Sequence, residues 1–89
     1  MELKNLRCFI SVYDAKSFGR AALTLNTTQS NVSARIRKLE QEFEGPLFQR
    51  LHRGIAPTAK GVLAYRYAKE VIERADTVAE AIRIDDAAA

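Results

Sequence analysis

The clearest helical pattern in this chain lies in residues 28–43, which read TQSNVSARIRKLEQEF. Val32, Ile36, Leu39 and Phe43 follow one another at intervals of four, three and four residues. On an α-helix this spacing gathers the four side chains on one narrow apolar stripe. We therefore predict a helix that packs against the rest of the protein through this stripe.

The face opposite the apolar stripe is polar. At about 100° per residue, four residues point almost directly away from the stripe: Ser30, Ala34, Arg37 and Gln41. Thr28, or Thr27 before it, can accept a hydrogen bond from a free backbone N–H group at the start of the helix. The side chains near that start are short and polar, which suits close approach to another surface. The helix is expected to be held from one side and to contact a partner with the other.

Two shorter helices are predicted before this one. Apolar residues at helical spacing indicate the first over residues 3–14. Ser17 is a suitable N-cap for the second, over residues 18–25.

The connection between the second and third helices is short. Ala21 and Ala22 have small side chains that let a neighbouring helix cross closely, and Asn26 tolerates the left-handed backbone angles of a turn. Two helices joined in this way, the second with a polar outward face, match the helix-turn-helix that reads DNA. An ordinary pair of helices in a small bundle is the alternative.

Residues 44–57 have a different character. Gly45 and Pro46 are expected to end the helix, with the glycine at its terminus and the proline just beyond. Residues 47–57 then predict a short β-hairpin, which must lean on the helices because two strands alone are not stable. The expected apolar anchors are Leu47, Phe48 and Ile55, and the expected exposed basic residues are Arg50, His52 and Arg53.

A long last helix is predicted over residues 59–84, with residues 85–89 as a frayed end. Its apolar residues alternate spacings of four and three, which is a heptad pattern. The helix is too long to be covered by the preceding residues, so we expect a partner, most simply the same helix of a second copy. The alternative is a single exposed helix. The expected dimer contacts are Ala64, Ala68, Val71, Ala75, Val78 and Ile82, broadened by Ile72 and Ala79.

Composition limits the class of protein. Eighty-nine residues allow one small domain, and no run approaches the roughly 20 apolar residues of a membrane span. The N-terminus does not resemble a signal peptide. The single cysteine, Cys8, has no partner for an intramolecular disulfide, so the expected location is the cytoplasm. Cys8 is expected to be buried or half-buried rather than reactive.

The positive charge is unevenly distributed. The formal net charge is +3, but residues 1–60 carry ten basic and five acidic residues, whereas residues 61–89 carry four and six. Between Ala15 and Leu39 there are five basic residues and no acidic one. Such a bias is expected of a protein that meets phosphate groups.

Taken together, these parts resemble the N-terminal DNA-binding domain of the LysR-type transcriptional regulators over nearly the whole chain. The combined spacing carries the resemblance rather than any single residue. The matching residues are Leu3, Leu6, Phe9, Ser17, Phe18, Ala21, Ala22, Leu25, Thr28, Gln29, Val32, Ser33, Ile36, Leu39, Glu40, Leu47, Phe48, Arg50, Arg53, Thr58 and Gly61.

The resemblance implies a mainly α fold, a winged helix-turn-helix of three helices and a β-hairpin wing, over residues 1–58. Residues 59–89 would be the linker helix, which pairs antiparallel with a second subunit in a homodimer. Helix 28–43 would enter the major groove of double-stranded DNA, and the wing would reach the minor groove or backbone through Arg53. Family members continue into a domain that senses a small-molecule effector, and that domain is absent from this chain.

The chain departs from the family pattern at four positions. Ser30 stands where proline is frequent, and Ala34 where many members have a long polar residue. Glu44 replaces the glycine that usually follows the recognition helix, and Gly45 comes one residue later. The path of the chain after that helix is therefore expected to differ from the family pattern. Pro57 stands where an aliphatic residue is common, which suggests a short second strand of the wing.

Roles in DNA binding can be assigned by side-chain chemistry. We expect base contacts from Gln29, Ser30, Asn31, Ser33 and Ala34, because a glutamine amide can pair with adenine and an alanine methyl can meet a thymine methyl. Other residues suit phosphates, where positive charge and helix N-termini help. These are Ser17, Thr28, Arg37 and Lys38.

Two of the basic residues on this helix have a second interpretation. Arg35 lies on the flank of the apolar stripe, so it either contacts a phosphate or shields the core. Lys38 precedes Glu42 by four residues, so it can form a surface ion pair instead of binding DNA.

Other functions are less well supported by the sequence. One histidine, one cysteine and no glycine-rich phosphate loop leave no constellation for an enzyme, and no cofactor or metal is expected. His52 has no second histidine beside it and is expected on a polar loop. A winged-helix module that binds another protein is the alternative, but it would need an apolar outward face on helix 28–43.

Overall fold

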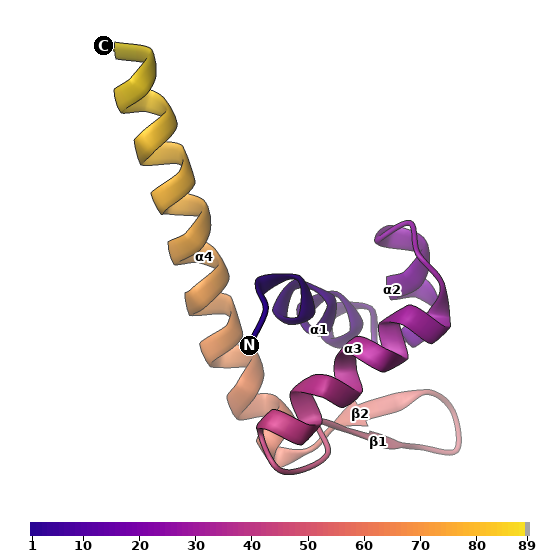
Figure 1. Ribbon diagram of the computed structural model, residues 1–89. Coiled ribbons are helices and arrows are strands. Elements are labelled where there is room, and N and C mark those ends of the chain that lie inside the picture. The colour runs from indigo at the N-terminus through magenta and orange to yellow at the C-terminus, as the bar shows by residue number, and fades with distance from the viewer. Residues whose placement is uncertain (89) are drawn as a thin grey trace.

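The computed structural model describes residues 1–88, with side chains through residue 85. Figure 1 shows α1, α2 and α3 gathered beside the β1–β2 hairpin, whereas α4 runs past them and projects away. The predicted three helices, hairpin and long last helix are confirmed. The elements within the described residues are α1 (Leu3–Ala15), α2 (Phe18–Thr24), α3 (Gln29–Glu42), β1 (Phe48–Arg50), β2 (Ile55–Pro57) and α4 (Ala59–Ala88).

The starts of α2 and α3 are set by hydroxyl caps, as predicted. The Ser17 hydroxyl oxygen accepts a hydrogen bond from the backbone N–H of Arg20 at 3.1 Å. The Thr28 hydroxyl oxygen accepts one from the backbone N–H of Asn31, also at 3.1 Å. Asn26 takes a φ of 53°, so the turn before α3 uses the left-handed conformation that asparagine tolerates. These caps fix where the two helices begin.

The prediction of a frayed end after residue 84 is wrong. Helix α4 continues to Ala88, and Ala89 lies outside the described residues. Residues 85–88 contain no glycine or proline, and alanine has the highest intrinsic helix propensity. The local sequence therefore carries nothing that would end the helix there.

The core lies between α1 and α3. Leu6, Phe9 and Val12 of α1 are buried, and so are Val32 and Leu39 of α3. Cys8 is also fully buried, as predicted, and Ile36 completes the buried part of the apolar stripe, with Phe43 partly buried beside it. This packing turns the opposite face of α3 toward solvent.

An aromatic cluster attaches the wing to the helices. The Phe48 ring of β1 lies 5.4 Å from the Phe9 ring and 5.8 Å from the Phe18 ring, measured between centroids. Leu47 and Ile55 are buried on either side, which confirms all three predicted anchors. The strands are antiparallel and pair Phe48 with Pro57. The second strand has three residues and is short, as predicted, but the first strand, which has no proline, has the same length.

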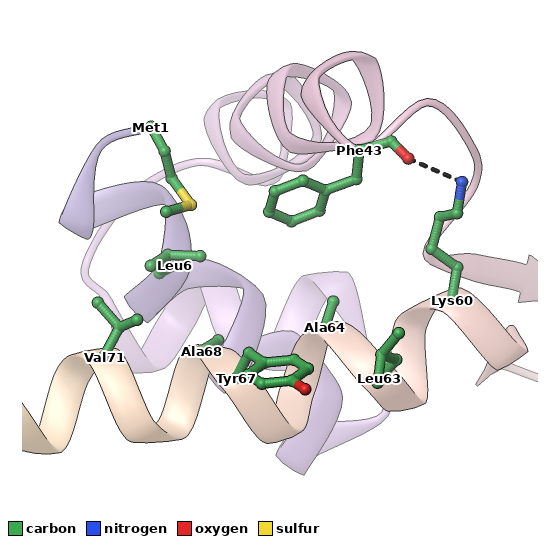
Figure 2. Close-up of a pocket in the computed structure, with 9 residues that line it drawn as sticks. All are labelled: Met1, Leu6, Phe43, Lys60, Leu63, Ala64, Tyr67, Ala68 and Val71. Carbon is green, nitrogen blue, oxygen red and sulfur yellow. Dashed lines mark hydrogen bonds between the residues drawn. The ribbon is translucent and has the colours of Figure 1, made fainter.

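Helix α3 is followed by a residue with left-handed backbone angles, at the position where the resemblance expects a glycine. Glu44 has a φ of 58° and adopts this conformation itself. The Lys60 ammonium of α4 donates hydrogen bonds to the carbonyl oxygens of Phe43 and Glu44 at 2.7 and 3.0 Å, which satisfies acceptors that a helix end leaves free (Figure 2). A Cβ at Gly45 would lie 2.9 Å from the Lys60 Nζ atom, so the glycine makes room for this contact.

Further hydrogen bonds join this helix end to the wing and to α4. The Glu40 carboxylate accepts a hydrogen bond from the backbone N–H of Leu47 at 2.8 Å. The Thr58 hydroxyl donates to the carbonyl oxygen of Pro46 at 2.6 Å and accepts from the N–H of Gly61 at 3.0 Å. A Cβ at Gly61 would collide with the Leu47 carbonyl, so only glycine allows this approach.

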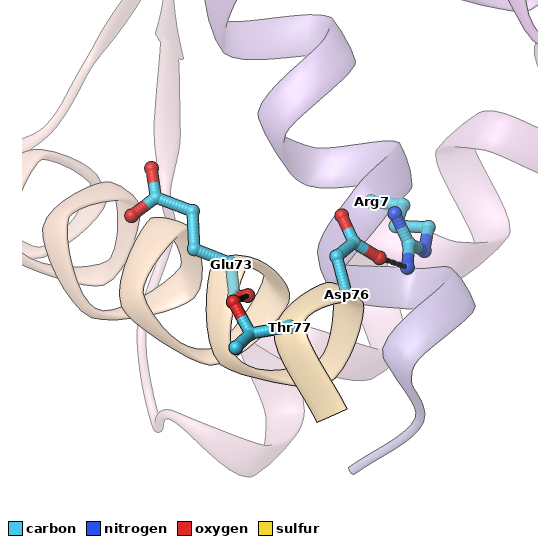
Figure 3. A network of polar contacts seen from close by, with 4 residues as sticks. All are labelled: Arg7, Glu73, Asp76 and Thr77. Carbon is cyan, nitrogen blue, oxygen red and sulfur yellow. Dashed lines mark hydrogen bonds and ion pairs between the residues drawn. The ribbon is translucent and has the colours of Figure 1, made fainter. Parts of the chain in front are cut away.

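Two contacts set the direction of α4 across α1. The Arg7 guanidinium donates to the Asp76 carboxylate at 2.6 Å (Figure 3). The Tyr65 hydroxyl donates to Asp14 at 2.6 Å, and its ring stacks on Tyr13 with centroids 3.9 Å apart. The hydrogen bond to Asp14, with burial and the negative charge adding to it, raises the pKa of Tyr65 to about 12. The part of α4 between Tyr65 and Asp76 is thus fastened to α1.

Replacing Glu40 by alanine is expected to destabilise the fold by about 1–3 kcal/mol, because the Leu47 N–H would lose its acceptor next to a buried side chain. Glu40→Gln should retain most of the stability, since an amide oxygen can also accept. Urea unfolding of both variants measures the difference. Glu70→Ala, at an exposed position on α4, is the control. An equal loss in Glu40→Ala and Glu70→Ala would contradict the prediction.

Candidate nucleic-acid interface

The solvent-facing side of α3 is polar and basic along its length. Ser30, Asn31, Arg37 and Lys38 are exposed, and Ala34 is half-buried among them. Four of the five are polar, and two carry a positive charge. This surface can therefore donate hydrogen bonds and attract anions, as predicted.

Gln29 begins α3 and lies next to the start of α2. Its amide oxygen is 3.5 Å from the position that a Cβ at Gly19 would occupy. Gln29, Gly19 and the capping residue Ser17 line one hollow beside the wing. Gln29 is exposed, so both the donor and the acceptor of its amide lie near the surface.

Asn31 makes a contact that the sequence did not indicate. Its side-chain nitrogen donates a hydrogen bond to the Thr27 hydroxyl at 3.0 Å. The predicted base contact would use the other hydrogen of this amide or its oxygen, unless the bond to Thr27 breaks. The neighbouring Thr28 hydroxyl is the cap of α3 and can still donate a hydrogen bond.

Arg35 lies on the inner flank of α3. It is half-buried, and its positive charge acts on the Cys8 thiol of α1. Burial raises the pKa of Cys8, and the Arg35 charge opposes this rise. Of the two interpretations of Arg35, its position favours shielding of the core.

The surface ion pair considered for Lys38 is not formed among the described residues. Its expected partner, Glu42, instead lies 3.4 Å from the amino group of Met1.

The wing completes the polar surface beside α3. Ser33 and Arg37 of α3 line a hollow together with Arg50 of β1. Arg50 and His52 also line the hollow beside Gln29, so the two hollows adjoin across Arg50. Arg53 is exposed at the tip of the hairpin. The structure thus brings α3, the start of α2 and the wing to one side of the molecule.

Three polar residues of this surface were not assigned from the sequence. Lys16 lines the same hollow as Gln29, and Arg20 is exposed on α2. Gln49 is exposed on β1 and lines the hollow with Arg37. The sequence could have indicated Lys16 and Arg20, because both lie between residues 15 and 39, where there are basic residues and no acidic one. Nothing in the local sequence distinguishes Gln49.

The residues expected at a dimer interface divide into two groups. Ala68 and Ile72 are buried in the protomer's own core, and Ala64 packs against it. Val71, Val78, Ala79 and Ile82 are exposed, and Ala75 is half-buried. The far part of α4 therefore presents an uncovered apolar face, whereas the near part uses its apolar residues within the protomer.

No helix in the described part of the chain is long and apolar enough to cross a membrane. Among the same residues, no group of three or more histidine, cysteine, aspartate or glutamate side chains is arranged to hold a metal ion.

A short helix, a tight turn, a helix with a polar outer face and a basic β-hairpin beside it define a winged helix-turn-helix protein. The model of the bacterial regulatory helix-turn-helix proteins of the lysR family matches residues 3–62. The chain belongs to this family of transcriptional regulators. The family is not one of enzymes, and nothing in these comparisons supports the protein-binding alternative.

Individual relatives agree with this assignment. The chain is 45% identical over 76 residues to the HTH-type transcriptional regulator CzcR of Bacillus cereus, covering 85% of this chain and 26% of that protein. It is 39% identical over 83 residues to the regulator BudR of Klebsiella aerogenes, covering 93% and 58%. The chain thus spans about a quarter of the length of the CzcR relative.

Two solved structures of DNA complexes have the same fold. A BenM_DBD/catB site 1 DNA complex superposes with a TM-score of 0.88 at 32% identity, covering 93% of this chain and 92% of that one. A CbnR_DBD–DNA complex superposes with a TM-score of 0.89 at 30% identity, covering 96% and 98%.

The burial of Cys8 predicts low thiol reactivity. A raised thiol pKa leaves little thiolate near neutral pH, and the side chain is fully enclosed. At pH 8 a disulfide reagent should modify the folded protein far more slowly than the protein unfolded in guanidinium, followed by absorbance of the released thiol. Equal rates in the two states would show that Cys8 is accessible in the folded protein.

Proposed function

We propose that this chain binds double-stranded DNA at specific sequences, with α3 in the major groove and the wing against the backbone or minor groove. The observation that carries the proposal is the shared surface of α3, the start of α2 and the wing, which is exposed, polar and positively charged. The two DNA complexes with matching folds support it. Titration with duplex DNA at two salt concentrations tests it, because phosphate contacts make binding weaken steeply with salt.

Base reading is assigned to the outer face of α3. Gln29, Ser30, Ser33 and Ala34 lie near its N-terminal half, the part of a recognition helix that reaches base edges. Gln29 has the side chain best suited to a bidentate pair with adenine. Asn31 joins this set through the part of its amide that Thr27 leaves free.

Phosphate contacts are assigned to the rim of this surface. On the helices these are Ser17, Thr28, Arg37 and Lys38, with Lys16 and Arg20 added from the structure. On the wing they are Arg50, His52 and Arg53. Positive charge and hydroxyl donors suit phosphate oxygens and position the protein without reading sequence. Arg35 is the weakest member of the set because its side chain is half-buried.

We further propose that the chain acts as a homodimer through α4, with residues 1–58 as the DNA-reading unit and residues 59–89 as the linker. The exposed apolar residues of α4 support this, since they have no cover within the described protomer. A two-fold dimer would bind a promoter or operator with dyad symmetry, its half-sites about 34–36 Å apart or a multiple of this. The location would be the bacterial cytoplasm, where the DNA is.

Gln29→Ala should weaken specific binding by about 1–3 kcal/mol and relax the preference at one base position, because the paired donor and acceptor would be lost. Competition with sites altered one position at a time measures this. Gln41→Ala, on the outer face of α3 near its other end, is the matched control. An unchanged preference in Gln29→Ala would remove Gln29 from base reading.

Arg53→Ala should weaken binding to all sequences alike and lower the slope of log affinity against log salt by about 1, since one phosphate contact is lost. The slope is measured by fluorescence anisotropy between low and moderate salt. Arg83→Ala, on the projecting part of α4, should leave the slope unchanged. If Arg53→Ala also leaves it unchanged, the Arg53 side chain does not contact DNA.

A further inference from the structure

Asn31, in the first turn of α3, is held at two points by the turn before the helix. Its side-chain nitrogen donates a hydrogen bond to the Thr27 hydroxyl oxygen at 3.0 Å. Its backbone N–H donates to the Thr28 hydroxyl oxygen at 3.1 Å. Two consecutive threonines therefore fix this residue, one through its side chain and the other through its backbone.

Thr27 is a firm anchor for the side-chain bond. Its backbone N–H donates to the carbonyl oxygen of Ala22 at 2.9 Å, and Ala22 is buried in the core. Thr27 is half-buried, whereas Asn31 is exposed. The Asn31 amide is thus tied to a part of the backbone that is itself bonded to α2.

The bond to Thr27 decides which end of the Asn31 amide faces outward. An asparagine amide carries a donor nitrogen and an acceptor oxygen on one carbon atom, and rotation of the group exchanges their places. With the nitrogen turned toward Thr27, the oxygen lies on the other branch of the group. The side chain then presents an acceptor to a partner, together with the second hydrogen of its nitrogen.

An outward acceptor distinguishes among the chemical groups of DNA. Phosphate oxygens are acceptors themselves, so they do not pair with an amide oxygen. In the major groove the donors on the base edges are the amino groups of adenine and cytosine, whereas guanine and thymine offer acceptor oxygens. The fixed amide therefore suits an amino group, and for adenine its second hydrogen can also donate to N7.

We propose that Thr27 is a positioning residue for base reading, which holds the Asn31 amide so that its oxygen accepts a hydrogen bond from the amino group of one adenine or cytosine. The proposal deepens the base-reading role of α3 under the proposed function and rests on it. Thr27 acts through the Asn31 side chain and does not itself touch the base.

The base pair that Asn31 contacts is found first. Selection from random duplexes by the 89-residue chain gives the preferred site, and the same selection with Asn31→Ala shows where Asn31 acts. We expect the variant to lose the preference at one base pair. A preference that is unchanged at every position, or a uniform loss of affinity for all sequences, would overturn the proposal. The second result would place Asn31 against a phosphate.

Removal of the amino group from that base pair is the second measurement. Purine replaces adenine, or pyrimidin-2-one replaces cytosine, so that only the amino group is lost. We expect the unmodified protein to bind the altered duplex about fivefold more weakly, because one hydrogen bond is lost. Asn31→Ala should bind both duplexes equally. Equal binding of the two duplexes by the unmodified protein would show that the amide is turned the other way, which overturns the proposal.

Variants of Thr27 then test the positioning. Thr27→Val keeps the shape of the side chain but removes the hydroxyl, so the Asn31 amide is free to rotate. The amino-group effect should fall from about fivefold to below about twofold, whereas Thr27→Ser should retain it. Thr24→Val, the same change at an exposed threonine of α2, is the matched control. An unchanged amino-group effect in Thr27→Val would overturn the role of Thr27.

A merely structural role of Thr27 predicts a different result. It would lower the stability of the start of α3 and weaken binding to the normal and the altered duplex by the same factor. Circular dichroism of each variant establishes that it is folded. Thr27→Ala removes the hydroxyl in a second way if the valine variant does not fold.

The positioning role and the proposed function fail in different ways. A chain that selects no preferred duplex overturns sequence-specific binding, and the role of Thr27 with it. A chain that selects a site through Gln29, with no dependence on Asn31 or Thr27, overturns the positioning role alone.

Discussion

The packing of the apolar stripe of α3 against α1 is the constraint on which the other features depend. Val32 and Leu39 are buried against α1, so α3 cannot rotate without exposing them to water. A helix held in this way has a fixed outward face, and that face carries the candidate base-reading residues. The cap at Thr28 adds the second condition, because it fixes the first residue that α3 presents to a partner.

The end of α3 joins three parts of the molecule. Glu40 holds the backbone at the entrance of the wing, and Lys60 brings α4 onto the last carbonyl groups of α3. Helix α3, the hairpin and helix α4 are therefore connected through one cluster of hydrogen bonds. A change in the direction of α4 would therefore displace the end of α3.

Helix α4 has two tasks along its length. Ala68 and Ile72 belong to the core, and Arg7–Asp76 fastens the helix to α1. Beyond that ion pair the apolar residues face solvent, as with Val78 and Ile82. The apolar residues of one heptad pattern thus pack within the protomer in the first part of α4 and are exposed in the last part. The pattern therefore continues beyond the point where α1 covers the helix.

The sequence by itself determined the elements, the buried side of α3, the wing anchors and the exposed basic positions, because periodicity and capping are local properties of the chain. Only the tertiary structure decided which residues of these elements contact one another and which remain exposed. The left-handed conformation of Glu44, the bond from Asn31 to Thr27 and the half-burial of Arg35 depend on neighbours that spacing does not reveal. The division of the α4 pattern between core and free face likewise depends on where α1 begins, because the contact of Arg7 with Asp76 is the last one between the two helices that a side-chain hydrogen bond marks.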